Sequence, residues 1–245
     1  MEALNTIVIK KLTKKFGNRT VISNFSFDFN DNKIYSIIAP SGAGKTTLLR
    51  IISGLEKDYL GSVDFSFKSV DSNIGFIFQE ASIFPWLTVK ENLLFGLKLD
   101  RNIRSEAHEL LEDIAKDVGL LDYLDHYPKQ LSGGQKQRVA FGRSLVLHPP
   151  VLLCDEPFSS LDDTIRQEMR ELLLKIQCKY RLTILFVTHS VEEALFLGDY
   201  TLKFTSSPLS NVVQEEISFD TKRDKELLYS AQFNRIKQKI ISNEN

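Results

Sequence analysis

A Gly-rich segment, APSGAGKTT at residues 39–47, combines residue types that bind polyphosphates. It follows a predicted buried strand, IYSII at 34–38, and leads into a predicted helix that ends at Gly54. Glycines let backbone N–H groups turn toward phosphate oxygens, and the start of a helix adds positive potential there. The spacing places Lys45 within reach of the β- and γ-phosphates and the Thr46 hydroxyl beside a Mg²⁺ ion. A purely structural turn is the alternative, and the Lys-Thr pair at this offset favours phosphate binding.

A second segment, VLLCDEP at residues 151–157, predicts a buried strand that delivers two carboxylates to its C-terminal edge. Ligands of α/β sheets bind at that edge. We expect Asp155 to hold Mg²⁺ through water and Glu156 to polarise an attacking water molecule. An acidic turn explains the segment equally well when it is considered alone. The phosphate-binding segment favours the catalytic interpretation.

A third segment, LSGGQKQRVAFGRS at residues 131–144, places Ser132 and two glycines at the predicted start of a helix. A simple cap needs no glycine pair, and two glycines let another surface approach the backbone closely. We therefore expect a contact surface at this helix start.

The predicted elements around these segments change character along the chain. Apolar and polar residues alternate in NTIVIKKL (5–12) and VISNFSFDFN (21–30), and SVDFSF (62–67) and NIGFIF (73–78) predict further strands. The apolar spacing is helical from Pro85 to about Leu147. Later elements are predicted as strands VLLC (151–154) and TILFV (183–187), a helix at about 163–179, a strand pair YTLKF (200–204) and VVQEEISF (212–219), and a charged helix from about 222.

This order predicts an α/β fold, in which a parallel core is interrupted by a helical subdomain. Capping boxes are expected at Thr88 with Glu91 and at Ser190 with Glu193. We expect a single domain over residues 1–245, divided into a core with a β subdomain (1–84 and 148–220), a helical subdomain (85–147) and a helical tail (221–245).

The composition is that of an ordinary globular chain, with 42% hydrophobic and 26% charged residues among 245 and a formal net charge of −1. We expect no nucleic-acid partner, because the chain has no overall basic excess. Cys154 and Cys178 predict neither a disulfide nor a metal pair, which fits a reducing cytosol. We expect neither a signal peptide nor a transmembrane helix, so work at a membrane would require docking onto a partner there.

Together the three segments resemble those of the ATP-binding-cassette (ABC) ATPases. LSGGQ is the signature of that family, is complete here, and lies shortly before CDEP as in the family. The resemblance extends from about residue 4 to 205. It implies a P-loop NTPase core with an antiparallel β subdomain and an inserted α-helical subdomain. It also implies a head-to-tail dimer, in which the signature of one subunit binds the ATP of the other.

The resemblance implies roles for individual residues. Residues expected to bind ATP are Phe16, Pro40, Ser41, Gly42, Ala43, Gly44, Lys45, Thr46, Thr47 and Gln79. Those expected to contact the partner's ATP are Ser132, Gly133, Gly134, Gln135 and Asp162. The expected Mg²⁺ ligands are Thr46, Gln79 and Asp155, and the expected catalytic residues are Lys45, Gln79, Glu156 and His189.

Each of these roles competes with a simpler one. Phe16, where Tyr is commoner, would stack on adenine or belong to the core. Gln79 could be a surface residue after a strand, and Asp162 could cap a helix as well as cross the dimer. Most lone histidines are structural, but His189 directly follows a predicted buried strand beside the site. Two departures from the family, Ala39 for Gly and Ser190 for Asp, should be tolerated.

The implied reaction is ATP plus water to ADP plus phosphate, coupled to motion. In QEASIFPWLTVKENLLFG (79–96), the residues Phe84, Trp86 and Leu87 would form an apolar groove for a membrane permease, or would anchor the helical insert in the core. The chain looks most like importers of the nitrate/sulfonate/taurine group, which also serves thiamine-precursor uptake. The implied partners are permease subunits, a second copy and, indirectly, a periplasmic or surface substrate-binding protein, at the cytoplasmic face of the membrane. An exporter ATPase, and a cassette ATPase acting on DNA or the ribosome, are the alternatives.

Overall fold

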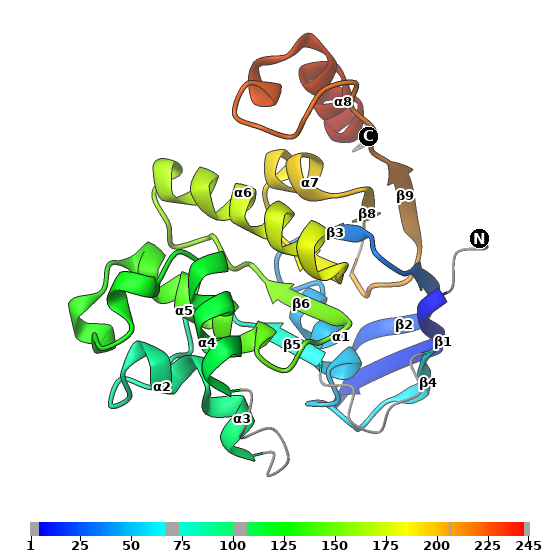
Figure 1. Ribbon diagram of the computed structural model, residues 1–245. Helices are drawn as coiled ribbons and strands as arrows, with labels where there is room; N and C mark the ends of the chain where they lie inside the picture. The colour runs from blue at the N-terminus through cyan, green and yellow to red at the C-terminus, as the bar shows by residue number, and fades with distance from the viewer. Residues whose placement is uncertain (1–4, 67–73, 100–106, 206, 243–245) are drawn as a thin grey trace.

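Two β-sheets of different kinds lie side by side in the computed structural model, which describes residues 5–66, 74–99, 107–205 and 207–242 (Figure 1). The antiparallel sheet has the order β2-β1-β4, and the larger sheet has the order β5-β6-β7-β3-β8-β9. The strands are β1 (Asn5–Phe16), β2 (Arg19–Asn30), β3 (Ile34–Ile38), β4 (Leu60–Phe65), β5 (Ile74–Ile77), β6 (Val151–Asp155), β7 (Thr183–Val187), β8 (Tyr200–Phe204) and β9 (Val212–Glu216).

The larger sheet is parallel except for β9, which pairs antiparallel with β8. Its central strands β6 and β7 are buried throughout and mostly apolar, because both faces of the sheet are covered. In β6, Leu152 and Cys154 face one hydrophobic core, whereas Val151 and Leu153 face the other. The predicted α/β class and the interrupted parallel core are confirmed.

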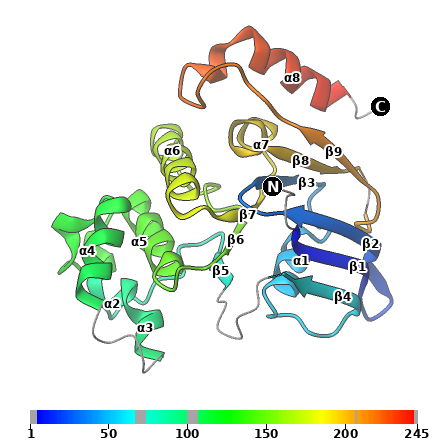
Figure 2. The same ribbon diagram turned by 45° about the vertical axis from the view of Figure 1, so that its right-hand side comes forward.

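Helices cover the larger sheet on both faces and extend beyond one end of it (Figures 1 and 2). The α-helices are α1 (Lys45–Ile52), α2 (Val89–Leu93), α3 (Phe95–Leu99), α4 (Ala107–Asp117), α5 (Gly133–Leu145), α6 (Asp163–Tyr180), α7 (Val191–Leu197) and α8 (Ala231–Ser242). Helix α1 packs in the core that the two sheets share, and α6 and α7 pack on the opposite face. None of the described helices is both long enough and apolar enough to cross a membrane.

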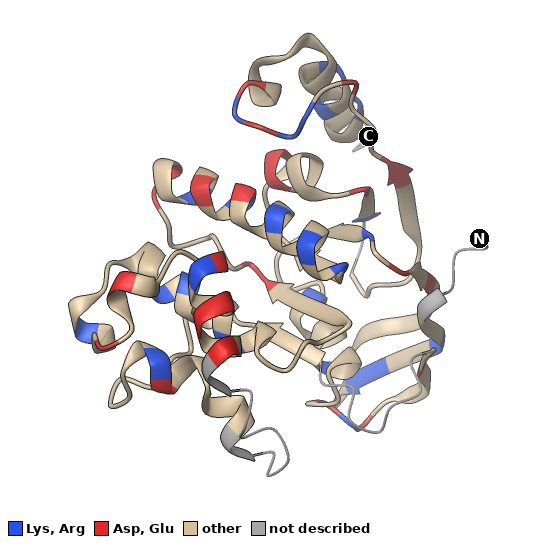
Figure 3. Cartoon of the chain, in the orientation of Figure 1, with Lys and Arg blue, Asp and Glu red and all other residues tan. Residues whose placement is uncertain are grey.

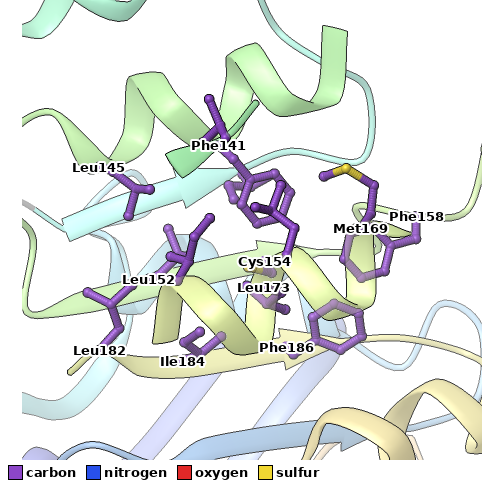
Figure 4. Close-up of a cluster of buried hydrophobic side chains, with 14 of the residues drawn as sticks. Phe141, Leu145, Leu152, Cys154, Phe158, Met169, Leu173, Leu182, Ile184 and Phe186 are labelled. Carbon is purple, nitrogen blue, oxygen red and sulfur yellow. The ribbon is translucent and has the colours of Figure 1, made fainter. Parts of the chain in front are cut away.

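The helical insert is joined to the sheet by one continuous apolar cluster (Figure 4). Phe141 of α5 stacks on Phe158, with ring centroids 6.2 Å apart, and Phe158 contacts Phe186 of β7 at 5.4 Å. Met169 of α6 is buried in the same cluster. The insert is therefore fixed through the end of β6 and the start of α6, both of which lie beside the segment CDEP.

Three predicted boundaries or caps differ from the structure. The charged helix predicted from about 222 begins at Ala231, because the Arg223 side chain donates to the carbonyls of Leu197 and Gly198 and holds the preceding segment in an irregular path. The last predicted strand ends at Glu216. Ser190 caps α7 as predicted, but the reciprocal half of its capping box is absent because the Glu193 side chain turns into the interior. Residue 67 of the predicted strand 62–67 and residue 73 of the predicted strand 73–78 lie outside the described part of the chain.

The long helix α6 connects the insert and the core through a polar contact at its end. Its acidic residues lie in the first half, whereas basic residues occur there and also toward the end (Figure 3). Asp163 in the first turn and Lys179 in the last turn are placed as the helix dipole favours. Near that end, Lys179 and the Tyr180 hydroxyl both donate to the carboxylate of Asp117, the last residue of α4. Burial raises the pKa of Asp117, but these two hydrogen bonds outweigh it and hold the pKa below the ordinary value.

Replacing Asp117 by Asn tests this contact. The variant should lose about 1–2 kcal/mol of unfolding free energy at neutral pH, because two donors lose a charged acceptor. The folded pKa lies below the ordinary value of 3.8. The contribution is therefore complete above that value and disappears as the pH falls through the folded pKa. Urea unfolding of both proteins from about pH 7 down to about pH 2 measures the difference on both sides of this loss.

The exposed Asp122 of the same helical layer provides the control. Asp122→Asn should change the unfolding free energy by less than about 0.5 kcal/mol. A difference between the wild-type protein and Asp117→Asn that stays constant at every pH would contradict the ionic character of the contact.

Candidate functional site

The phosphate-binding segment forms a tight loop between β3 and α1. Gly42 and Gly44 have φ angles of 72° and 112°, in the left-handed region that favours glycine. A Cβ atom at Gly44 would lie 2.4 Å from the Val21 side chain, so a larger residue cannot fit without displacing β2. The turn is closed by the Ala43 N–H, which donates to the Pro40 carbonyl at 3.2 Å. The sequence-predicted loop and the start of α1 at Lys45 are both present in the structure.

Lys45 lies beneath this loop and is buried. Its Nζ donates to the carbonyl oxygens of Ala39 at 2.8 Å and Pro40 at 3.3 Å. Ala39 is itself buried, so its methyl group is accommodated at the strand end. The ammonium has neutral acceptors in these two contacts, and an anionic phosphate oxygen would make a stronger, charge-assisted hydrogen bond.

Two carboxylates reach the loop from the end of β6, as predicted. The Thr46 hydroxyl donates to Asp155 Oδ1 at 3.0 Å. Burial raises the pKa of the Asp155 carboxyl, and the hydrogen bond from Thr46 only partly offsets this. A cation beside the carboxylate would therefore stabilise its charged form.

Glu156 and His189 also meet at this edge, from the ends of β6 and β7. Glu156 Oε2 lies 3.2 Å from His189 Nδ1. Glu156 has φ of +47°, which is rare for a residue with a side chain, and its N–H donates to the Val187 carbonyl at 3.0 Å. This backbone bend turns the side chain toward the loop. The His189 side chain is 63% exposed, so a purely structural role in the core is excluded.

Glu156 and the phosphate-binding loop line a cavity of about 360 Å³ between the two sheets, whereas His189 and Asp155 lie behind this lining, in contact with Glu156 and Thr46. It is lined by Phe16, Arg19, Val21, Ser41, Gly42, Gly44, Lys45, Thr46, Thr47 and Glu156. Phe16 is 51% exposed, so it belongs to the cavity wall and not to the core. Arg19 was not predicted as a site residue, and its Nη2 donates to the Gly42 carbonyl at 3.1 Å across the cavity mouth. Gln79 follows β5 at the same edge of the sheet but is exposed and does not line the cavity.

A larger cavity of about 800 Å³ lies between α6 and the segment that precedes α8. Its walls mix acidic and basic side chains, including Arg166, Glu171 and Lys225. None of the predicted phosphate-loop residues reaches it. The smaller cavity is therefore the candidate site, because the chemistry converges there.

The signature segment caps its helix and packs on α6. Ser132 Oγ accepts the Gln135 N–H at 3.2 Å, and Gln135 Oε1 accepts the Ser132 N–H at 2.9 Å. A Cβ atom at Gly134 would lie 2.6 Å from the Ile165 side chain, whereas one at Gly133 would meet only Leu161, at 4.0 Å. At Gly134 the approaching surface in this structure is α6 of the same chain, and contact of its backbone with a partner's ATP stays a prediction. Ser132 and Gly133 remain exposed, away from the residues that line the chain's own cavity.

Asp162 caps α6 beside the signature, and its Oδ1 accepts the Ile165 N–H at 3.0 Å. The simpler role considered for this residue is thus present in the structure. The Asp162 side chain sits on an exposed loop end, which leaves it accessible to a second molecule.

The loop containing Trp86 is fixed by hydrogen bonds to a buried asparagine, Asn92, which was not predicted from the sequence. Asn92 of α2 is fully buried, and its Nδ2 donates to the carbonyls of Phe84, Leu87 and Thr88 at 3.0–3.1 Å. Its Oδ1 accepts the Phe84 N–H at 2.8 Å. Trp86 is 70% exposed and touches Phe84 with ring centroids 5.6 Å apart, so the alternative role of Trp86 as a core anchor is wrong.

The loop that carries His189 is fixed by a buried polar network, also missed from the sequence. The Thr188 hydroxyl donates to Glu193 Oε2 at 2.6 Å, and Glu193 Oε1 lies 3.5 Å from Arg170 Nη2 of α6. Arg166 donates to the Leu161 carbonyl at 2.6 Å. Only the spacing of Ser190 and Glu193 gave a local signal, and it pointed to a cap.

Asn92→Leu should disorder the Trp86 loop, because a buried apolar side chain of similar size cannot replace these hydrogen bonds. We expect a loss of about 2–4 kcal/mol of unfolding free energy and a fall in the fluorescence anisotropy of Trp86, the only tryptophan. Asn234→Leu, at an exposed position of α8, is the matched control. An anisotropy in Asn92→Leu equal to that of the wild-type protein would show that Asn92 does not order the loop.

The chain is similar in sequence to known ATP-binding proteins. A family model described as ABC transporter matches residues 22–159, more than half of the chain. The chain is 42% identical over 212 residues to an aliphatic sulfonates import ATP-binding protein of Pseudomonas syringae pv. syringae, covering 86% of each chain. It is 37% identical over 218 residues to an Fe(3+) ions import ATP-binding protein of Photorhabdus laumondii subsp. laumondii, covering 86% of this chain and 62% of that protein.

Among solved structures, the fold is similar to a dimeric ATP-binding cassette in a post-hydrolysis state with bound ADP and Pi. The TM-score is 0.74 at 28% identity, and the match covers 87% of this chain and 99% of the other. The antiparallel sheet, P-loop core and helical insert follow the architecture expected from the signature. The chain belongs to the ABC transporter family of ATP-binding proteins.

Proposed function

We propose that this protein is the ATP-binding and hydrolysing subunit of an ABC importer. The observation that carries the proposal is that the Lys45 loop and Glu156 line one cavity at the carboxyl edge of three adjacent strands, where Asp155 contacts Thr46 and His189 contacts Glu156. The relatives named above are import ATP-binding proteins, and the solved neighbour holds ADP and Pi. These likenesses support hydrolysis of ATP to ADP and phosphate.

The residues in and beside the cavity have different roles in the proposed reaction. The backbone of the loop from Pro40 to Thr47 and the Lys45 ammonium bind the phosphates and neutralise charge on the transferred group. Glu156 accepts a proton from the attacking water, and His189 orients Glu156 and the γ-phosphate. Phe16 stacks on the base at the other end of the cavity. Gln79 stays a prediction as an additional ligand.

Thr46 and Asp155 fit a magnesium ion. Both offer oxygen donors, 3.0 Å apart, which are the ligands that Mg²⁺ prefers. In the described residues no group of three or more His, Cys, Asp or Glu forms a metal site, and Mg²⁺ commonly takes one carboxylate together with substrate phosphates and water. When bound, the ion would neutralise negative charge on the phosphate oxygens.

We infer a head-to-tail dimer as the working form. Ser132, Gly133 and Asp162 are exposed and lie outside the chain's own cavity. They are therefore free to meet the γ-phosphate held by a second copy, with Gln135 fixing Ser132 and Gly134 setting the distance to α6. The dimeric state of the solved neighbour supports this arrangement.

The exposed aromatic loop is proposed as the contact with the permease. Phe84, Trp86 and Leu87 present apolar surface on a loop that Asn92 holds in place, as expected for a groove that receives a partner's helix. The protein would then sit at the cytoplasmic face of the membrane. We propose a small-molecule cargo of the nitrate, sulfonate, taurine or thiamine-precursor type, selected by the permease and a substrate-binding protein.

Glu156→Gln should lower the rate of phosphate release by at least about 10²-fold, because the amide cannot accept the proton from water. ATP binding should persist, and size-exclusion chromatography with Mg-ATP should show a dimer. Glu109→Gln, an exposed carboxyl of α4, is the control and should hydrolyse ATP at the wild-type rate. Wild-type turnover by Glu156→Gln would remove this residue from the proposed role.

Trp86→Ala should weaken capture of the permease about 30-fold, as expected for an aromatic anchor worth 2 kcal/mol or more. The measurement is recovery of a multi-spanning protein by the tagged chain from detergent-solubilised host membranes. Tyr229→Ala removes an equally exposed aromatic side chain before α8 and should leave recovery unchanged. Equal recovery with both variants would place the permease contact elsewhere.

A further inference from the structure

Lys14 lies directly behind the ring of Phe16. The two residues are separated by one residue on β1, and the Lys14 ammonium is 4.6 Å from the centre of the Phe16 ring. Lys14 is 3% exposed, whereas half of Phe16 is open to the cavity. One face of the ring is therefore covered by a cation, and a nucleotide base has the opposite face to stack on.

The ammonium is held in place by the segment that follows α1. Its Nζ lies 3.2 Å from Glu56 Oε1 and 3.1 Å from Asp58 Oδ2, and it also donates to the Asp58 carbonyl. Glu56 Oε1 in turn accepts the Asp58 N–H at 3.0 Å, and the Glu56 N–H donates to the Arg50 carbonyl of α1. Lys14 cannot move away from the ring without breaking these contacts.

These contacts join the two halves of the cavity. Phe16 belongs to the antiparallel sheet, whereas the phosphate loop belongs to the parallel sheet and leads into α1. A nucleotide that spans both halves needs a fixed distance between ring and loop. Lys14 connects β1 to the far end of the helix that starts at Lys45, so it sets the position of the ring relative to the phosphate loop.

We propose that Lys14 is a positioning residue for the nucleotide base. It holds the Phe16 ring from behind and, as a cation on one face, draws electron density from the ring, which favours stacking of an electron-rich base on the other face. This inference rests on the proposed role of Phe16 in base stacking. A lysine with only a structural ion pair would act differently, because the effect of replacing Lys14 on nucleotide binding should depend on the base and on Phe16.

The test compares binding of Mg-ATP with binding of Mg-tripolyphosphate, which has the phosphates but no base, by calorimetry on the full chain. Lys14→Met should raise the Kd for ATP about two- to fivefold and leave the Kd for tripolyphosphate unchanged. Lys14→Arg should restore ATP binding, because a guanidinium also packs on an aromatic face. Lys15→Met, at the exposed residue between Lys14 and Phe16, is the matched control. In a Phe16→Ala background, Lys14→Met should cause no further loss.

Two results would overturn the inference: an equal loss for ATP and tripolyphosphate, or the same loss with and without the Phe16 ring. Glu56→Gln keeps the lysine and weakens its anchor, so a smaller loss specific to ATP is expected if Lys14→Met fails to fold. A wild-type chain that binds neither compound would contradict the proposed function itself. Wild-type binding of ATP that Lys14→Met leaves unchanged would contradict only the role of Lys14.

Discussion

The parallel pairing of β6, β7 and β3 is the constraint on which the candidate site depends. Parallel strands present their carboxyl ends at one edge, so the residues that follow them must meet. Asp155 ends β6 and Glu156 follows it, His189 follows β7, and the phosphate loop follows β3. The pairing is maintained by apolar side chains on both faces of the sheet, because backbone hydrogen bonds alone contribute little net stability.

A buried polar network extends this constraint to the outer helices. The Glu193 carboxylate accepts a hydrogen bond from the Thr188 hydroxyl, next to His189, and lies 3.5 Å from Arg170 Nη2 of α6. Buried charges persist only where partners satisfy them, so a shift of the His189 loop must be accommodated by α6. The same helix is capped by Asp162 and packs against Gly134 of the signature. The sheet edge that carries His189 and the proposed dimer surface are thus connected through contacts with α6.

The cavity depends on a second kind of contact, between two sheets whose described strands do not pair with each other. Arg19 reaches from the antiparallel sheet to the Gly42 carbonyl, and Lys14 reaches from the same sheet to Glu56 in the segment that follows α1. The approach of Val21 to Gly44 leaves no room for a side chain at that glycine. Long cationic side chains and one close backbone contact therefore define the width of the site, whereas its chemistry resides in the parallel sheet.

The sequence by itself determined the features that arise from neighbouring residues. The loop at Gly42 and Gly44, the strand at 183–187 and the capping box of Thr88 with Glu91 follow from steric limits, apolar runs and hydrogen bonds within a few residues. Only the tertiary structure decided which distant group each side chain meets. Trp86 is exposed, Glu193 turns inward and Gly134 faces Ile165, although their local sequences suited a core anchor, a capping box and an approaching partner. Periodicity shows which face of an element is apolar, but the element that covers this face is selected by packing across the whole chain.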